Sequence, residues 1–155
     1  MAALRRAPVP TGDPIVVRGA ALDLLARREH AARELDAKLV ARFGRDAPID
    51  EVLQRLRDEG LQSDQRFAEA FVRAQRQRGR GPLRILHELA GRGIERELAA
   101  ACVDASAPEW AEAARAWKCR RYGEARVGSA AERSRIACQL QQRGFGTAQI
   151  RFALE

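Results

Sequence analysis

Apolar residues recur every three or four positions along most of the chain, which is the spacing of an amphipathic helix. Leu35 and Leu39 form one such stripe, and Val52 and Leu56 form another. No segment alternates apolar and polar residues as a half-buried strand does. Leu, Ala, Arg and Glu, which favour helices, dominate the composition. The pattern therefore predicts an all-α protein.

Glycines, prolines and capping residues divide the stripes into nine predicted helices. Six of these helices open near residues 18, 48, 63, 82, 106 and 129, and another follows His30. Two short helices carry the apolar residues Leu98 to Val103 and Ile150 to Leu154. Ser106 with Glu109, and Ser129 with Glu132, match the capping-box spacing. Residues 1–17 contain three prolines and one glycine, and this composition predicts a flexible tail.

The predicted helices repeat in groups of three, with a period of about 50 residues. The repeated pattern consists of two Leu or Ile residues, four positions apart, followed by an arginine. The matching sets are Leu35, Leu39, Arg42; Ile85, Leu89, Arg92; and Ile136, Leu140, Arg143. The last two arginines are each followed by Gly and an apolar residue, a pattern less easily explained by chance similarity of short helices. We predict three tandem three-helix repeats at 18–60, 61–105 and 106–155, stacked into an elongated, curved array.

Basic residues exceed acidic ones, with a net charge of +7 and a pI near 10.5. Lys38 and Lys118 are the only lysines, and a preference for arginine over lysine does not explain the excess itself. Residues 18–60 hold nine basic and nine acidic side chains, whereas 106–155 hold nine and five. The excess belongs to the second and third repeats and indicates an acidic partner, either nucleic acid or an acidic protein face.

The strongest candidate surface lies between Arg73 and Leu89, where a helix end, a tight turn and a new helix at Pro82 are expected. No acidic residue lies between its first and last arginine. Its arginines are Arg73, Arg76, Arg78, Arg80 and Arg84. Guanidinium groups bind phosphates and carboxylates bidentately, and a helix N-terminus offers free N–H groups to an anion. The alternative is a solvated basic turn. Gly79 and Gly81 lack the other residues of a phosphate-binding P-loop, so ATP binding is not expected.

A second basic patch surrounds Tyr122, with Glu124 as the only acid among its members. The patch consists of Lys118, Arg120, Arg121 and Arg126. If the repeats stack in register, the two patches line one groove, and Arg27 and Arg28 extend the same surface from the first repeat. Tyr122 either stacks on a nucleic-acid base or packs under the following turn.

The remaining chemistry-bearing residues indicate no enzyme. The three cysteines lack the close spacing of a zinc site or a disulfide framework, and Cys102 and Cys138 are expected in the core. His30 is expected at a helix end, and His87 has no second histidine four residues on. Trp110 and Trp117 either anchor the core of the third repeat or form an exposed platform. No apolar run reaches a membrane span and no signal peptide is evident, so we expect a cytoplasmic monomer without cofactor or metal.

Two motifs resemble those of the RecX family. Arg-Arg-Glu-His at 27–30, followed by Glu34-Leu35 and Lys38-Leu39, resembles the family's opening motif. The segments 64–73 and 78–85 resemble its central motif. The resemblance covers about residues 18–155. This chain departs from the family at Ala31, where a small hydroxylated residue is common, and at 74–75, where Ser-Arg is common.

The resemblance implies a regulator of the RecA recombinase, without catalytic activity of its own. Family members are tandem three-helix repeats that lodge in the groove of the RecA–DNA filament. They usually inhibit its ATPase, strand exchange and co-protease activities. The partners implied are therefore the RecA filament and, more weakly, DNA. A different hypothesis from the charge alone is a general DNA- or RNA-binding helical module.

Overall fold

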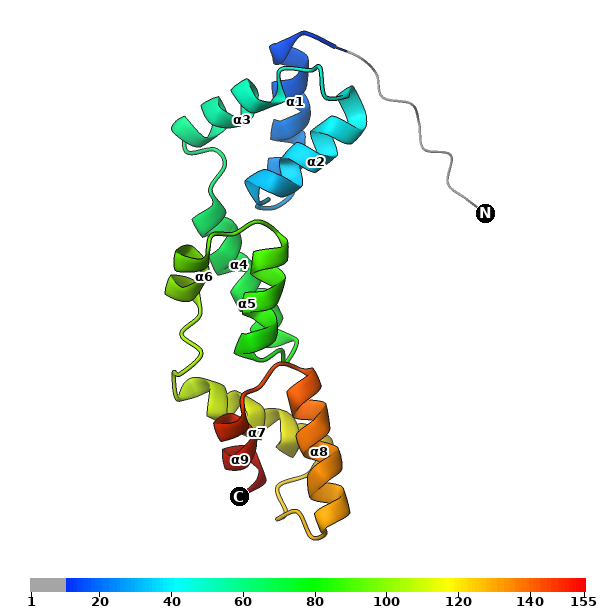
Figure 1. Cartoon of the computed structure of the whole chain (residues 1–155), viewed down its shortest axis with the longest axis vertical. Coiled ribbons are helices and arrows are strands. Elements are labelled where there is room, and N and C mark those ends of the chain that lie inside the picture. Colours follow the sequence, from blue (N-terminus) through cyan, green and yellow to red (C-terminus); the bar gives the residue numbers. More distant parts are fainter. Residues whose placement is uncertain (1–10) are drawn as a thin grey trace, which may run out of the picture. The chain divides into compact units, whose positions relative to one another are not determined.

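A computed structural model describes residues 11–155, and residues 1–10 of the predicted tail lie outside the described part. In those 145 residues the fold is all-α, as predicted, with nine helices and no strand (Figure 1). The helices are α1 Pro14–Leu25, α2 Ala32–Phe43, α3 Ile49–Asp58, α4 Asp64–Gln77, α5 Pro82–Gly91, α6 Arg96–Cys102, α7 Glu109–Tyr122, α8 Ala130–Gln142 and α9 Thr147–Leu154.

The chain divides into two compact units, of which the first ends at Phe67 and the second runs from Ala68 to Glu155. The first unit contains α1–α3 and the start of α4. The second contains the rest of α4 and α5–α9, which are the helices expected in the second and third repeats. The predicted boundaries between the three repeats, at residues 60 and 105, stay predictions.

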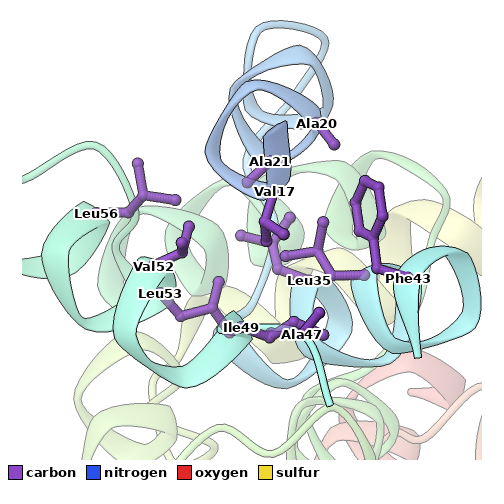
Figure 2. Packing of buried hydrophobic residues seen from close by; sticks show 11 residues of the cluster. Val17, Ala20, Ala21, Leu35, Phe43, Ala47, Ile49, Val52, Leu53 and Leu56 are labelled. Carbon is purple, nitrogen blue, oxygen red and sulfur yellow. The ribbon is translucent and has the colours of Figure 1, made fainter. Parts of the chain in front are cut away.

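The core of the first unit is formed by α1, α2 and α3 (Figure 2). Val17 of α1 is fully buried and points toward Leu35. The expectation of a tail as far as residue 17 is therefore wrong for 14–17. Pro14 occupies the first helical turn, where its missing N–H costs nothing, and Asp13 caps the helix by accepting from the Ile15 N–H at 2.8 Å.

The N-terminus of α2 is capped by a residue from another helix. Ala31 has no side chain to cap it, and Asp64 Oδ1 instead accepts from the Ala32 N–H at 2.8 Å. Gln62 Nε2 donates to the His30 carbonyl at 3.1 Å and to Asp64 Oδ1 at 2.8 Å. The carboxylate that caps α2 therefore lies 32 positions further along the chain.

His30 lies between α1 and α2, where the sequence placed it at the end of a helix. Only 2% of its surface is exposed, and Nδ1 lies 3.0 Å from the Arg28 carbonyl oxygen, to which a protonated Nδ1 donates. Burial lowers the pKa of this imidazole, because an imidazolium would lose its hydration there.

The second unit buries Ile85 and Leu89 of α5, Ile136 and Leu140 of α8, and Phe145. Trp110 and Trp117 of α7 are 3% and 7% exposed, which confirms them as core residues. Trp110 Nε1 also donates to the Asp104 carbonyl at 2.9 Å. Cys138, in contrast, is exposed, so its predicted place in the core is wrong.

The matching helix ends of α5 and α8 have the same geometry. Gly93 and Gly144 have φ of 80° and 92°. The following residues, Ile94 and Phe145, donate backbone N–H groups to Leu89 and Leu140, each at 3.1 Å, and are themselves buried. These are the C′ and C″ positions of one helix-stop motif, in agreement with the repeat.

Of the two predicted capping boxes, the one at Ser129 forms only its first hydrogen bond, and the one at Ser106 does not form. Ser129 Oγ accepts from the Glu132 N–H at 3.1 Å, but the Glu132 carboxylate accepts from the Gly128 N–H. Ser106 caps nothing, because its N–H and hydroxyl both donate to Asp104 Oδ1. This local turn competes with the cap, and α7 begins later, at Glu109.

Candidate functional site

The start of α5 packs against the turn that follows α8 (Figure 1). The N–H of Gly81 donates to the Arg143 carbonyl at 2.7 Å, and that of Leu83 donates to the Gly144 carbonyl at 3.0 Å. A Cβ added to Gly81 would lie 2.4 Å from the Gly144 carbonyl carbon, so only glycine permits this approach. We call this contact the α5–α8 joint. The N–H groups of Gly81 and Leu83 are therefore used inside the protein and are not available to an anion.

Two arginines cross the joint in opposite directions. Arg84 donates from Nη1 to the Gln142 carbonyl at 3.3 Å, and its Nε pairs with Glu88 at 2.8 Å. Arg143 donates from Nη1 to the carbonyls of Arg78 and Gly79, at 3.2 and 3.3 Å. Arg84 therefore holds the joint together, besides being a candidate contact residue. Arg143 was seen in the sequence only as the arginine shared by the repeats.

A pocket of about 340 Å³ lies beside the joint, and we call it the basic pocket. It draws residues from the α4–α5 turn, α5, α7 and α8. Its lining residues are Arg80, Arg84, Trp117, Arg121, Gln139, Gln142 and Arg143. The structure thus brings Arg80 and Arg84 of the first predicted patch together with Arg121 of the second, and adds Arg143. No acidic side chain is among the lining residues.

The positive charges of the arginines in the basic pocket repel one another. The pKa of Arg143 is lowered by burial and by the neighbouring charges of Arg80, Arg121 and Arg84. Its guanidinium also lies over the Trp117 ring, 4.8 Å from the centroid. An anion placed here would meet several guanidiniums at once and would relieve their mutual repulsion.

Tyr122 packs within the protein, but against α7 and α8 and not under the turn that follows α7 as predicted. It is half-buried, and its hydroxyl donates to Gln139 Oε1 at 2.7 Å. Its ring meets the edge of Trp117 with centroids 6.1 Å apart, and Arg135 lies over it at 5.7 Å. Tyr122 therefore supports the wall of the basic pocket through Gln139.

The other arginines of the first patch differ in whether they also contact the core. Arg73 and Arg78 have exposed side chains on α4 and at its end. Arg76 is also exposed, but its guanidinium lies over the buried Trp110 ring at 4.6 Å. A change of Arg76 therefore disturbs packing as well as charge.

The second patch does not form one surface. Lys118 is 5% exposed and donates to the Ala125 carbonyl at 2.7 Å, so it holds the loop after α7, and its role as a contact residue stays a prediction. Arg126 and Lys118 line a second pocket that also contains Glu124 and Glu155, whereas Arg121 lines the basic pocket. Arg120 is exposed on α7.

Arg27 and Arg28 belong to the first compact unit. Both are exposed, and Arg28 makes an ion pair with Glu34 that raises the pKa of the guanidinium. Their participation in one surface with the basic pocket stays a prediction.

Within residues 11–155, no group of three His, Cys, Asp or Glu side chains is arranged to hold a metal ion. The same part of the chain contains no helix long and apolar enough to cross a membrane.

Comparison with known proteins identifies the family. A family model described as the second three-helix domain of RecX matches residues 63–103, which span α4–α6. The regulatory protein RecX of Halorhodospira halophila is 43% identical over 137 residues, covering 88% of this chain and 85% of the relative. The chain belongs to the RecX family. A RecX of Stenotrophomonas maltophilia is 40% identical over 133 residues, covering 86% of this chain and 82% of the relative.

The RecX fold is shown by solved structures as well. The crystal structure of RecX from Lactobacillus salivarius aligns with a TM-score of 0.76, covering 90% of this chain and 93% of that one at 23% identity. The resemblance seen in the two sequence motifs is therefore confirmed, and so is the repeat of three-helix elements.

Proposed function

We propose that this RecX-family protein regulates the RecA recombinase, mainly as an inhibitor, by binding in the groove of the RecA–DNA filament. The observation that carries the proposal is the 43% identity to a named regulatory protein RecX over 88% of the chain. Binding there would limit the filament's ATPase, strand exchange and co-protease activities. We place this activity in the cytoplasm and assign it to a monomer.

The arginines of the second unit support the proposal. Arg78 and Arg80 lie at the α4–α5 turn, and Arg80 shares the basic pocket with Arg121. Both components of the filament, the DNA backbone and acidic protein side chains, carry groups that guanidiniums bind. Regulation by binding alone requires such a surface and no catalytic residue.

The test is a titration of RecA's DNA-dependent ATPase with the purified protein, followed by strand exchange. We expect both activities to fall as the protein approaches the concentration of RecA. Unchanged activities at a stoichiometric excess would show that the proposed function is wrong.

A general nucleic-acid-binding module is the second candidate, favoured by a pocket lined with four arginines and no acid. It predicts tight binding to naked DNA that weakens steeply with salt. Fluorescence anisotropy with naked DNA and with RecA–DNA separates the two. A preference for RecA–DNA supports the filament regulator, and equal affinity supports the general module.

A further inference from the structure

The basic pocket holds more guanidiniums than the α5–α8 joint needs. The joint itself uses two arginines, because Arg84 reaches the Gln142 carbonyl and Arg143 reaches those of Arg78 and Gly79. Arg80 and Arg121 line the same pocket. In the part of the chain that the structure describes, neither of these two makes an ion pair. Their charges are therefore available to a ligand.

The arrangement suits phosphate better than carboxylate. The guanidiniums come from the α4–α5 turn, α5, α7 and α8, and the amides of Gln139 and Gln142 also line the pocket. Donors from several directions match a tetrahedral phosphate, whereas a planar carboxylate is satisfied by one bidentate arginine. The four arginines carry four positive charges, and Glu88 offsets one of them at its ion pair with Arg84. One singly charged group would leave most of that charge uncompensated.

The size of the basic pocket and the position of Trp117 in it indicate contact with the backbone of a nucleic-acid strand. A volume of about 340 Å³ leaves room for more than one phosphate group. Trp117 is 7% exposed and its ring is covered by Arg143, so no open ring face is offered to a base. The pocket is therefore suited to sugar-phosphate and not to reading bases.

We propose that the basic pocket binds consecutive phosphodiester groups of a DNA strand, contacted by Arg80 and Arg121. Arg84 and Arg143 are positioning residues that hold the α5–α8 joint and set the spacing of the contacts. The inference rests on the proposed function in taking the strand to be that of the RecA filament. It assigns a specific place for the DNA, which the proposed function leaves open.

The experiment compares two double variants of the full-length protein with equal loss of charge. R80A/R121A removes the proposed contacts. R96A/R133A is the matched control, since both arginines are exposed in the same unit and line no part of the basic pocket. Anisotropy of fluorescein-labelled oligo(dT) is measured over a series of salt concentrations.

We expect R80A/R121A to weaken binding and to reduce the slope of log K against log salt by about 1.4, or about 0.7 for each lost phosphate contact. The control should keep the wild-type slope. R80K/R121K keeps the charge but loses the guanidinium fork, and should recover part of the affinity. A slope for R80A/R121A that equals the control's would overturn the inference.

Two further measurements, of Tm and of RecA ATPase inhibition, distinguish DNA from free phosphate and from an acidic protein surface. They also distinguish failure of this inference from failure of the proposed function. If tripolyphosphate raises the Tm of the wild type but oligo(dT) does not, the site binds free phosphate and the DNA assignment is wrong. If R80A/R121A loses inhibition of the RecA ATPase while its oligo(dT) binding stays at the control level, the pocket binds an acidic protein surface instead. If the wild type fails to inhibit RecA but R80A/R121A still reduces the salt slope by the expected amount, the proposed function fails and the pocket assignment stands.

Discussion

His30 is a buried histidine whose imidazole meets the backbone carbonyl of Arg28 at 3.0 Å. Charges of both signs act on it, from Arg28 and Lys38 on one side and Glu34 on the other. The lowered pKa shows that burial and the two cations outweigh the favourable contacts. Protonation of His30 is therefore coupled to the stability of the first unit.

We predict that His30 makes the protein less stable as the pH falls below about 6.5, the ordinary pKa of histidine. Below that pH the unfolded chain binds a proton that the folded chain resists, so the free energy of unfolding decreases as the pH falls. Urea unfolding at pH 7.5 and pH 5.5 should show the decrease, and H30Q should make it smaller. H87Q, at an exposed position, is the control and should keep the wild-type dependence. An equal effect of both variants would contradict the assignment to His30.

Gly144 is restricted twice, by its φ of 92° and by the neighbouring helix. A Cβ there would lie 2.4 Å from Arg84 Cβ, whereas a Cβ on Gly123, with φ of 84°, would meet nothing within 4 Å. Comparing the two positions distinguishes the cost of backbone strain, which both share, from the cost of crowding at the α5–α8 joint, which only Gly144 has.

We predict that G144A destabilises the second unit more than G123A does. Both variants pay the left-handed strain of about 1–2 kcal/mol. G144A adds about 1–3 kcal/mol of overpacking, because the start of α5 must move. Urea unfolding followed by tryptophan fluorescence reports on this unit, since Trp110 and Trp117 both lie in it. Equal losses would show that the joint is not tightly packed.

At the scale of the helix, α2 and α5 are completed by residues far from them in the sequence. Asp64 supplies the cap of α2, and the carbonyls of Arg143 and Gly144 accept from the start of α5. Neither helix begins with a residue whose side chain caps it, since Ala31 and Gly81 precede them. These ends therefore depend on tertiary contacts and not on local sequence.

We predict that D64A lowers the free energy of unfolding by about 1–2 kcal/mol, because it removes the cap of α2. Asp64 Oδ1 accepts from both Ala32 and Gln62, so two buried or half-buried donors lose their partner. D64N keeps an acceptor and should lose less. D58A is the control, because exposed Asp58 accepts from Gln54 on its own helix. Unfolding by urea measures all three, and a loss for D64A no larger than for D58A would contradict the cap.

At the scale of the whole molecule, the net charge of +7 is concentrated by the fold and not only by composition. Arg80 and Arg121 are 41 positions apart and line one pocket, while Lys118 is turned inward to Ala125 and Arg126 faces two glutamates elsewhere. The fold thus joins part of the two basic patches in the basic pocket and leaves Arg73, Arg78 and Arg120 exposed outside it.

We predict that R78A/R80A/R121A weakens inhibition of the RecA ATPase, shifting half-inhibition to a roughly tenfold higher protein concentration. Arg76 is left unchanged because it covers Trp110. R96A/R133A/R151A removes the same charge from exposed positions of the same unit and should inhibit like the wild type. The coupled ATPase assay measures both, with circular dichroism to verify folding. Similar inhibition by the two triple variants would place the contact on another surface.

Sequence reasoning worked where the deciding interactions are local. The stop at Gly93 depends on a hydrogen bond from Ile94 to Leu89, five residues away, so the Arg-Gly-apolar pattern was sufficient to predict it. Ser129 was found as a cap for the same reason. Ser106 was misjudged because Asp104, also nearby, offered its hydroxyl a stronger local partner. The predicted tail extended too far along the chain because Pro14 begins α1.

The sequence by itself determined the all-α fold, the positions of the helix stops, the excess of arginine and the membership in the RecX family. Local backbone hydrogen bonds and the spacing of apolar side chains are sufficient for the first two. Only the tertiary structure decided which arginines are available. Arg84 and Arg143 are used at a joint between segments about 60 positions apart (58 for Arg84 with Gln142), and Lys118 is buried by the loop after its own helix. A guanidinium's role depends on the carbonyls and acids that packing brings to it, and those neighbours are distant in the sequence.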